Sequence, residues 1–103
     1  MINIEVYEKW MKYALMEAIK AFDLGEVPIG CIIVKDNKII GKGYNQVETL
    51  NDATAHAEMI AITSASSTIN DWRLNDSFLF VTKEPCPMCA GAILNSRVKA
   101  IVY

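Results

Sequence analysis

Two short stretches, about thirty residues apart, carry side chains that could do chemistry. His56-Ala57-Glu58 supplies an imidazole and a carboxylate, and Pro85-Cys86-Pro87-Met88-Cys89 supplies two thiols. Histidine nitrogen and cysteine sulfur are donors that zinc binds in a tetrahedral arrangement. The chain has one histidine, and its third cysteine, Cys31, lies inside an apolar run, so three protein donors are available. Because a structural zinc site is normally closed by four side chains, this set predicts a fourth position open to water.

Glu58 is the candidate for moving protons at such a site. Two thiolates cancel the double positive charge of zinc, so the metal acidifies water less than it would beside three histidines. A base is therefore needed, and Glu58 lies two residues from His56. Water activation with proton transfer describes hydrolysis at an electron-poor carbon. The combination of His-x-Glu with a downstream Pro-Cys-x-x-Cys is the zinc deaminase signature, so we predict hydrolytic deamination of a nucleobase.

Each motif taken alone has a simpler interpretation. A Cys-x-x-Cys pair is common in structural zinc sites and redox motifs, and a His-x-Glu pair can simply lie on a helix surface. Redox chemistry would leave His56 and Glu58 unexplained, and a nucleophilic cysteine would leave the second thiol unexplained. Cys31 is interpreted as a small buried core residue and not as a metal ligand.

Composition limits the class of protein. The length of 103 residues predicts one domain, residues 1–103, and the 52% apolar and 21% charged content is typical of a globular chain. No apolar run approaches the ~20 residues that span a bilayer, and the N-terminus lacks the pattern of a signal peptide. We therefore expect a cytoplasmic protein without a membrane segment. The net charge of −2 argues against binding by general attraction to phosphate, so a nucleic acid would need a local patch or a nucleotide pocket.

The elements that must position the two motifs follow from periodicity and turn signals. Residues 7–24 show helical spacing of Trp10, Met11, Ala14, Leu15, Ala18, Ile19 and Phe22, which predicts a helix that buries this stripe. A hairpin is predicted at 29–34 and 38–44, followed by a polar loop. Thr54 is the expected N-cap of a helix over 55–65, with His56 in its first turn. A strand at 78–82, a helix from Pro87 to Asn95 and a strand at 99–103 complete the chain.

These elements predict an α/β fold in which helices flank a mixed sheet. The last strand–helix–strand unit is a crossover, so its two strands should be parallel. Both metal-binding stretches fall at the beginnings of predicted helices. Two helix N-termini can therefore converge on one metal ion, where their dipoles favour thiolates.

Several further stretches resemble the bacterial tRNA-specific adenosine deaminases, within the cytidine deaminase-like superfamily. The resemblance covers essentially the whole chain. It is carried by residues 26–30 (EVPIG), 43–45 (GYN), 52–58 (DATAHAE), 72–74 (WRL) and 84–93 (EPCPMCAGAI).

The resemblance implies a three-layer cytidine deaminase-like fold with one zinc ion held by His56, Cys86 and Cys89. It implies that Glu58 shuttles protons, that Asn45 hydrogen-bonds a flipped adenine, and that Val27 and Pro28 line its pocket. The backbone N–H groups of Ala57 and Cys86 would position groups at the metal. The implied reaction makes inosine at the anticodon wobble position of a tRNA stem-loop, within a homodimer.

Two departures from the family pattern matter. Ala53 stands where the family usually has proline, and the chain ends in its fourth predicted strand, so we expect it to be truncated at the C-terminus relative to the family. An open last strand predicts self-association. Two alternatives remain: a deaminase of free guanine, cytosine or their nucleotides, and a catalytically silent zinc-binding assembly module.

Overall fold

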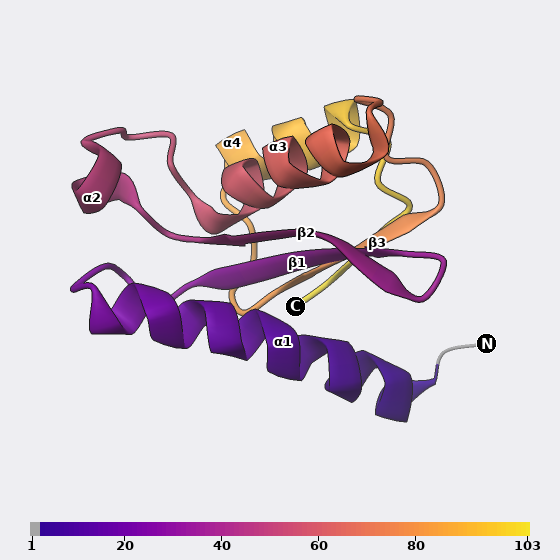
Figure 1. Ribbon diagram of the computed structural model, residues 1–103, viewed down its shortest axis with the longest axis horizontal. Coiled ribbons are helices and arrows are strands. Elements are labelled where there is room, and N and C mark those ends of the chain that lie inside the picture. Colours follow the sequence, from indigo (N-terminus) through magenta and orange to yellow (C-terminus); the bar gives the residue numbers. More distant parts are fainter. Residues whose placement is uncertain (1–2) are drawn as a thin grey trace.

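The computed structural model describes residues 3–103 as a mixed sheet with helices on both faces (Figure 1). The four strands lie in the order β2-β1-β3-β4. β1 pairs antiparallel with β2 and with β3, and β3 pairs parallel with β4. The elements in chain order are α1 (Ile4–Asp23), β1 (Gly30–Lys35), β2 (Lys38–Tyr44), α2 (Val47–Leu50), α3 (Ala57–Ile69), β3 (Ser77–Val81), α4 (Pro87–Asn95) and β4 (Ala100–Val102).

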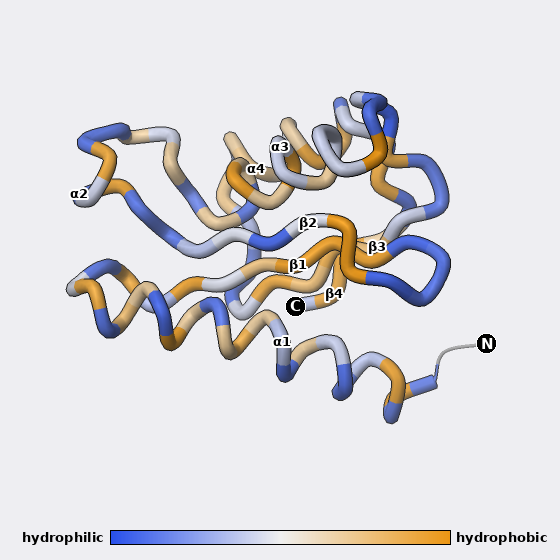
Figure 2. The backbone as a smooth tube through the Cα atoms, in the orientation of Figure 1, coloured by the Kyte–Doolittle hydropathy of each residue, from blue (hydrophilic) through white to orange (hydrophobic). Residues whose placement is uncertain are grey.

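The sheet separates two apolar clusters. α1 covers one face, and α3 and α4 lie together on the other (Figure 1). Along β1, Cys31 and Ile33 belong to the cluster on the α3 side, whereas Ile32 and Val34 belong to the cluster on the α1 side. This alternation follows from the two-residue period of a strand. Because β1 is buried on both faces, it is apolar along most of its length, as the hydropathy colouring shows (Figure 2).

Small residues allow the helices to approach the sheet closely. Gly41 and Gly43 of β2 face the fully buried alanines Ala57, Ala61 and Ala65 of α3. A Cβ atom on Gly43 would overlap the Ala57 carbonyl oxygen and lie 2.7 Å from the Ala61 nitrogen. The backbone of α3 therefore rests directly on β2. The ladder between β1 and β2 also shifts register between Ile33 and Val34, beside Gly41.

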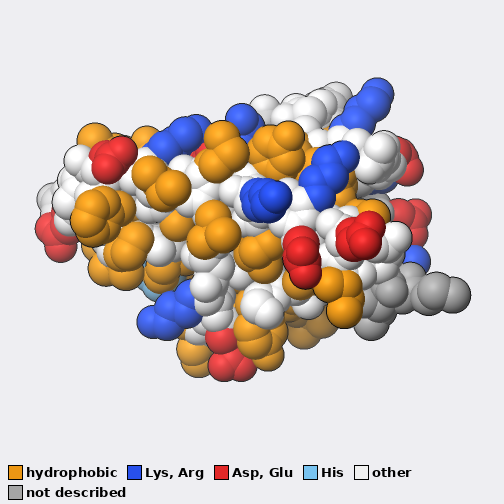
Figure 3. Space-filling model, turned by 90° about the horizontal axis from the view of Figure 1, so that it is seen from below, with side chains coloured by type: hydrophobic (Ala, Val, Ile, Leu, Met, Phe, Trp, Pro, Cys, Tyr) orange, Lys and Arg blue, Asp and Glu red, His pale blue; other side chains and the backbone are white. Residues whose placement is uncertain are grey.

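The predicted buried stripe of α1 is wrong in its second half. Trp10, Ala14 and Ala18 are buried, but Leu15, Ile19 and Phe22 are exposed, and Phe22 is 68% exposed. The buried face of α1 instead runs through Glu17 and Ala21. On this face the helix backbone at Ala14 and Ala18 approaches β1 so closely that a Cβ atom on Gly30 would overlap it. Apolar side chains consequently gather on the outer surface of α1 (Figure 3).

Helix boundaries near the metal motifs also differ from the prediction. α3 begins after His56, which is its N-cap, and Thr54 instead donates to Asp52 through its N–H and its hydroxyl, both at 2.8 Å. The polar loop that follows β2 contains the one-turn helix α2, which the sequence analysis missed. The α4 boundaries and the parallel β3–β4 pair are as predicted.

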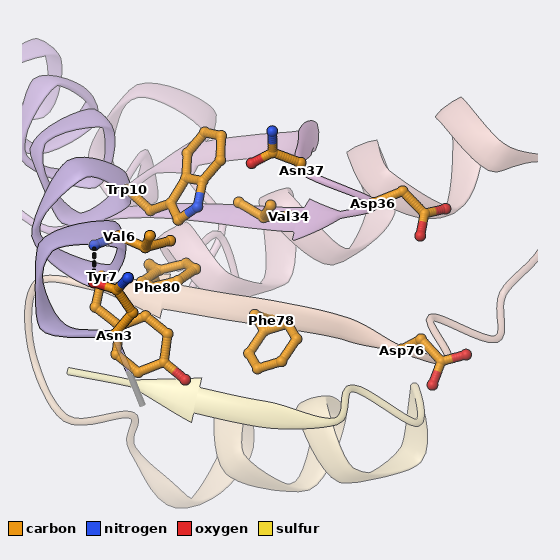
Figure 4. Close-up of a pocket in the computed structure, with 10 residues that line it drawn as sticks. All are labelled: Asn3, Val6, Tyr7, Trp10, Val34, Asp36, Asn37, Asp76, Phe78 and Phe80. Atoms are coloured by element: carbon orange, nitrogen blue, oxygen red, sulfur yellow. Dashed lines mark hydrogen bonds between the residues drawn. The ribbon is translucent and has the colours of Figure 1, made fainter. Parts of the chain in front are cut away.

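A hollow opens on the α1 face of the sheet, away from the beginnings of α3 and α4 (Figure 4). Trp10, Val34 and Phe80 form part of its apolar lining, and Asp36 and Asp76 lie at one end. No helix within residues 3–103 is long and apolar enough to cross a membrane.

The contact between β2 and α3 generates a stability prediction. We expect Gly43→Ala to lower the free energy of unfolding by about 2 kcal/mol or more, because the new methyl group must displace helix backbone. Gly91→Ala is the control: it adds a methyl group within α4 where no atom lies within 4 Å, and should leave stability unchanged or raise it by about 0.5–1 kcal/mol. Urea unfolding followed by circular dichroism measures both variants, and equal midpoints would contradict the close contact.

Candidate metal centre

The two motifs meet because α3 and α4 begin side by side on one face of the sheet. His56 is the N-cap of α3, and Cys86 is the N-cap of α4 with Pro87 at its first helical position. Proline suits that position because the N–H it lacks would have no partner within the helix. Cys89, one turn into α4, is fully buried. Two helix beginnings and one turn of helix thus bring an imidazole and two sulfurs together.

The spacing of these three groups fits a tetrahedral metal. The Nδ1 atom of His56 lies 3.6 Å from the Sγ atom of Cys86 and 3.4 Å from that of Cys89. All three donor atoms lie within 4.8 Å of one another. Tetrahedral zinc, with nitrogen at ~2.0 Å and sulfur at ~2.3 Å, separates the two kinds of donor by about 3.6 Å. The donor set and its geometry therefore fit zinc, through Nδ1 of the histidine.

The electrostatics of the two thiols also favour a bound cation. Hydrogen bonding from the backbone N–H of Cys89 lowers the pKa of the Cys86 thiol. Burial, and then the nearby Glu58 carboxylate, raise the pKa of the Cys89 thiol. A buried thiol beside a carboxylate does not ionise at neutral pH without a compensating positive charge, which a metal ion supplies.

Glu58 lies beside these donors without belonging to their set. Its side chain is only 4% exposed, and its carboxylate is close enough to act on the pKa of both metal-site thiols. An acid so placed can hold a proton next to the metal position. Cys31 is packed in the core below, where burial, and then Glu58 and Cys89, raise the pKa of its thiol. Cys31 is not one of the three donors that converge.

The residues expected to bind the base lie on two neighbouring loops. Asn45 directly follows β2 and is 7% exposed. Its Oδ1 atom accepts a hydrogen bond from the Val47 N–H at 3.1 Å. The Asn45 N–H donates to the Ile29 carbonyl at 3.1 Å, which ties this loop to the segment that carries Val27 and Pro28. Both Val27 and Pro28 are exposed, so their side chains could contact a bound molecule.

The sequence reasoning missed the contribution of Glu26. Its carboxylate is buried and accepts hydrogen bonds from α2, across the gap between the two loops. In the sequence, Glu26 is a single acidic residue between Gly25 and an apolar segment. It belongs to no periodic pattern and to no metal-binding motif, so neither kind of signal could identify it.

The model of the cytidine and deoxycytidylate deaminase zinc-binding region matches residues 4–103. The chain belongs to this family. The α/β fold with a mixed sheet flanked by helices, expected from the sequence, is confirmed by solved structures of the family's fold.

The relatives of this chain include enzymes named as tRNA deaminases. It is 57% identical to a chloroplastic tRNA(adenine(34)) deaminase of Arabidopsis thaliana over 98 residues, which are 95% of this chain and 8% of that protein. It is 53% identical to a tRNA-specific adenosine deaminase of Buchnera aphidicola, over 91% of this chain and 62% of the relative. The deaminase-family chain thus spans less than two thirds of these relatives.

Solved structures give two similar folds. One is a guanine deaminase from Bacillus subtilis, with a TM-score of 0.89 and 43% identity over 99% of this chain and 64% of that one. The other comes from a study of A-to-I editing by tRNA:A34 deaminases, with a TM-score of 0.88 and 41% identity over 91% of this chain and 72% of that one. Backbone similarity of the deaminase-family chain therefore does not separate the two substrates.

The donor geometry generates a metal-binding prediction. We expect Cys89→Ser to weaken zinc binding by more than the 10–100-fold that loss of a supporting contact costs, because a ligand itself is removed. Cys31→Ala is the matched control, since it removes a buried sulfur that does not converge with His56. Competition with a chelating dye measures zinc affinity, and circular dichroism checks the fold. Equal zinc affinity in the two variants would contradict the assignment of donors.

Proposed function

We propose that this chain converts adenosine to inosine at the wobble position of a tRNA anticodon, by zinc-dependent hydrolysis. The observation that carries the proposal is the convergence of His56, Cys86 and Cys89 with the buried carboxylate of Glu58 beside them. The names of the relatives support tRNA as the substrate class. The proposed partner is an anticodon stem-loop, and the proposed stoichiometry is one zinc ion per chain.

In this proposal each residue of the centre has one role. His56, Cys86 and Cys89 hold the zinc, which when bound supplies a Lewis acid that activates water. Glu58 takes a proton from the attacking water and delivers protons to the purine ring and to the departing amine, so that adenosine and water become inosine and ammonia. Its burial keeps the carboxylate out of bulk water, where proton transfer would be less directed.

Backbone and loop groups complete the proposed site. The first hydrogen bond within α3 runs from the Ile60 N–H to the His56 carbonyl, so the Ala57 N–H lies among the unpaired donors of the helix N-terminus. We propose that it acts with the backbone N–H of Cys86 to position groups at the metal. Asn45 would hydrogen-bond the base, and Val27 and Pro28 would contact one side of it.

Deamination of a free base is the second candidate function. The similarity to the Bacillus subtilis guanine deaminase favours it, with a TM-score as high as that for the tRNA enzymes. The net charge of −2 also provides no general attraction to the phosphates of RNA. Assays on an anticodon stem-loop, free guanine and free cytosine, run side by side, separate the two functions. Turnover of a free base alone would reject the tRNA proposal.

A homodimer or larger assembly is proposed on different grounds. Among residues 3–103, β4 is an edge strand that pairs with β3 alone, and it contains no charged residue. Unprotected strand edges of this kind pair with other chains. We also propose a cytoplasmic location, which suits the bacterial tRNA-specific adenosine deaminases among the relatives.

Glu58 gives the sharpest test of the reaction. We expect Glu58→Ala to abolish deamination of the stem-loop while the protein keeps about one equivalent of zinc, because the carboxylate moves protons and does not hold the metal. Glu84→Ala is the control, since it removes an exposed carboxylate. Inosine is measured by mass spectrometry of digested RNA, and zinc by elemental analysis. A Glu58→Ala variant as active as the parent would reject the shuttle, and one without zinc would make Glu58 a ligand.

The open edge of β4 generates a prediction about assembly. We expect the parent to sediment at micromolar concentration as a species larger than an 11.5 kDa monomer. Ile101→Lys should shift it toward the monomer, because a charge on an edge strand opposes pairing. Leu24→Lys is the control, since Leu24 is also an exposed apolar residue but lies at the end of α1, outside the sheet. A monomeric parent would contradict self-association.

A further inference from the structure

Side chains satisfy the first N–H groups of the one-turn helix α2. Backbone bonds hold its other end, from the Leu50 N–H to the Gln46 carbonyl at 2.9 Å and from the Asn51 N–H to the Glu48 carbonyl at 3.2 Å. The Val47 N–H donates to Asn45 Oδ1 at 3.1 Å, and the next two N–H groups, of Glu48 and Thr49, donate to Glu26 at 3.1 Å and 2.6 Å. The first three N–H groups within the helix, which a helix start leaves without an internal partner, are therefore satisfied by Asn45 and Glu26 together.

Glu26 is built into the molecule as an acceptor. Its side chain is 5% exposed, and both carboxylate oxygens are used, since Oε2 also accepts from the Thr49 hydroxyl at 2.6 Å. The hydrogen bond from the Thr49 hydroxyl lowers the pKa of the Glu26 carboxyl and outweighs burial, which acts to raise it. Glu26 is therefore an anion at neutral pH. No lysine or arginine pairs with it among residues 3–103. Its partners are the backbone and hydroxyl of a loop 22 and 23 residues ahead.

The loop that Glu26 holds leads directly into the metal centre. The Gln46 N–H donates to the Ala55 carbonyl at 3.0 Å, which closes the loop at the residue before His56. At its other end the loop begins with Asn45, whose N–H is bonded to Ile29. Movement of α2 would therefore act on both the metal histidine and Asn45.

The same contacts fix which end of the Asn45 amide is free. A backbone N–H can only be met by the oxygen, so the bond from Val47 assigns Oδ1 to α2. The Nδ2 group has no hydrogen-bond partner among the described residues. Every fully buried side-chain nitrogen or oxygen in that part of the chain has a partner. The Asn45 NH₂ is therefore not fully buried, and it is a hydrogen-bond donor suited to a ring nitrogen of a purine.

We infer that Glu26 is a positioning residue that holds α2 so that the Asn45 amide presents its NH₂ to the base. This inference rests on the proposed function only in requiring a purine substrate. Glu26 touches neither the metal donors nor the reacting atoms, and acts through Asn45. If Glu26 had a purely structural role, replacing it would lower the stability of the protein, and the effect on KM would not depend on the presence of Asn45.

The test is a double-mutant cycle. Glu26→Gln keeps the side-chain shape, but its NH₂ faces an N–H donor and at least one of the bonds to α2 is lost. We expect KM to rise about tenfold or more, with a smaller change in kcat and unchanged zinc content. In an Asn45→Ala background the same change should add little, because the amide that Glu26 positions is gone. Glu48→Gln is the matched control, since Glu48 is an exposed acid on the same helix.

Kinetics are measured on whichever substrate the parent turns over, an RNA stem-loop or free guanine, so failure of the tRNA proposal leaves this test intact. A readout that needs no turnover is the ¹⁵N NMR signal of the Asn45 side chain, identified by its loss in Asn45→Ala. Glu26→Gln should shift it and Glu48→Gln should not. Fully additive effects of the two substitutions on KM, or an unmoved Asn45 signal in Glu26→Gln, would overturn the inference.

Discussion

The structure depends on the direct contact between the backbone of α3 and strand β2. Gly41 and Gly43 have no side chains, and the alanines of α3 are small, so the helix lies against the strand without a layer of larger residues between them. Such contacts tolerate little displacement because protein interiors are packed like crystals. The position of His56 at the start of α3 is therefore set by the sheet. Cys86 and Cys89 are placed similarly, since α4 packs against α3 and begins directly after β3.

Much of this arrangement was predictable from the sequence. The three groups that converge could be selected from residue type and spacing, because zinc chemistry restricts both. The boundaries of α4 were predicted correctly, since Pro87 is a strong local signal for a first helical position. The parallel β3–β4 pair followed from the crossover rule. These features share a property: each is determined by local chemistry or by a topological rule.

Features determined by tertiary contact were predicted less well. Leu15, Ile19 and Phe22 have helical spacing, yet lie on the outside of α1, because a different face of the helix packs against the sheet at Gly30. Hydrophobicity alone therefore selected the wrong stripe. The start of α3 was assigned to Thr54, although that side chain bonds with Asp52 and His56 is the cap. α2 has no internal signal, since the groups that hold it come partly from Glu26, far along the chain.

The separation of α2 and its loop from the packed core has an evolutionary consequence. The three proposed metal donors are fixed by helices that rest on the sheet, whereas Asn45 and the exposed Val27 and Pro28 belong to connecting segments. Surface loops accept substitutions and changes in length more readily than packed elements do. Enzymes that descend from one ancestor could thus change the base that they deaminate while they keep the same reaction. Guanine and tRNA deaminases that share this backbone are what such a history would leave.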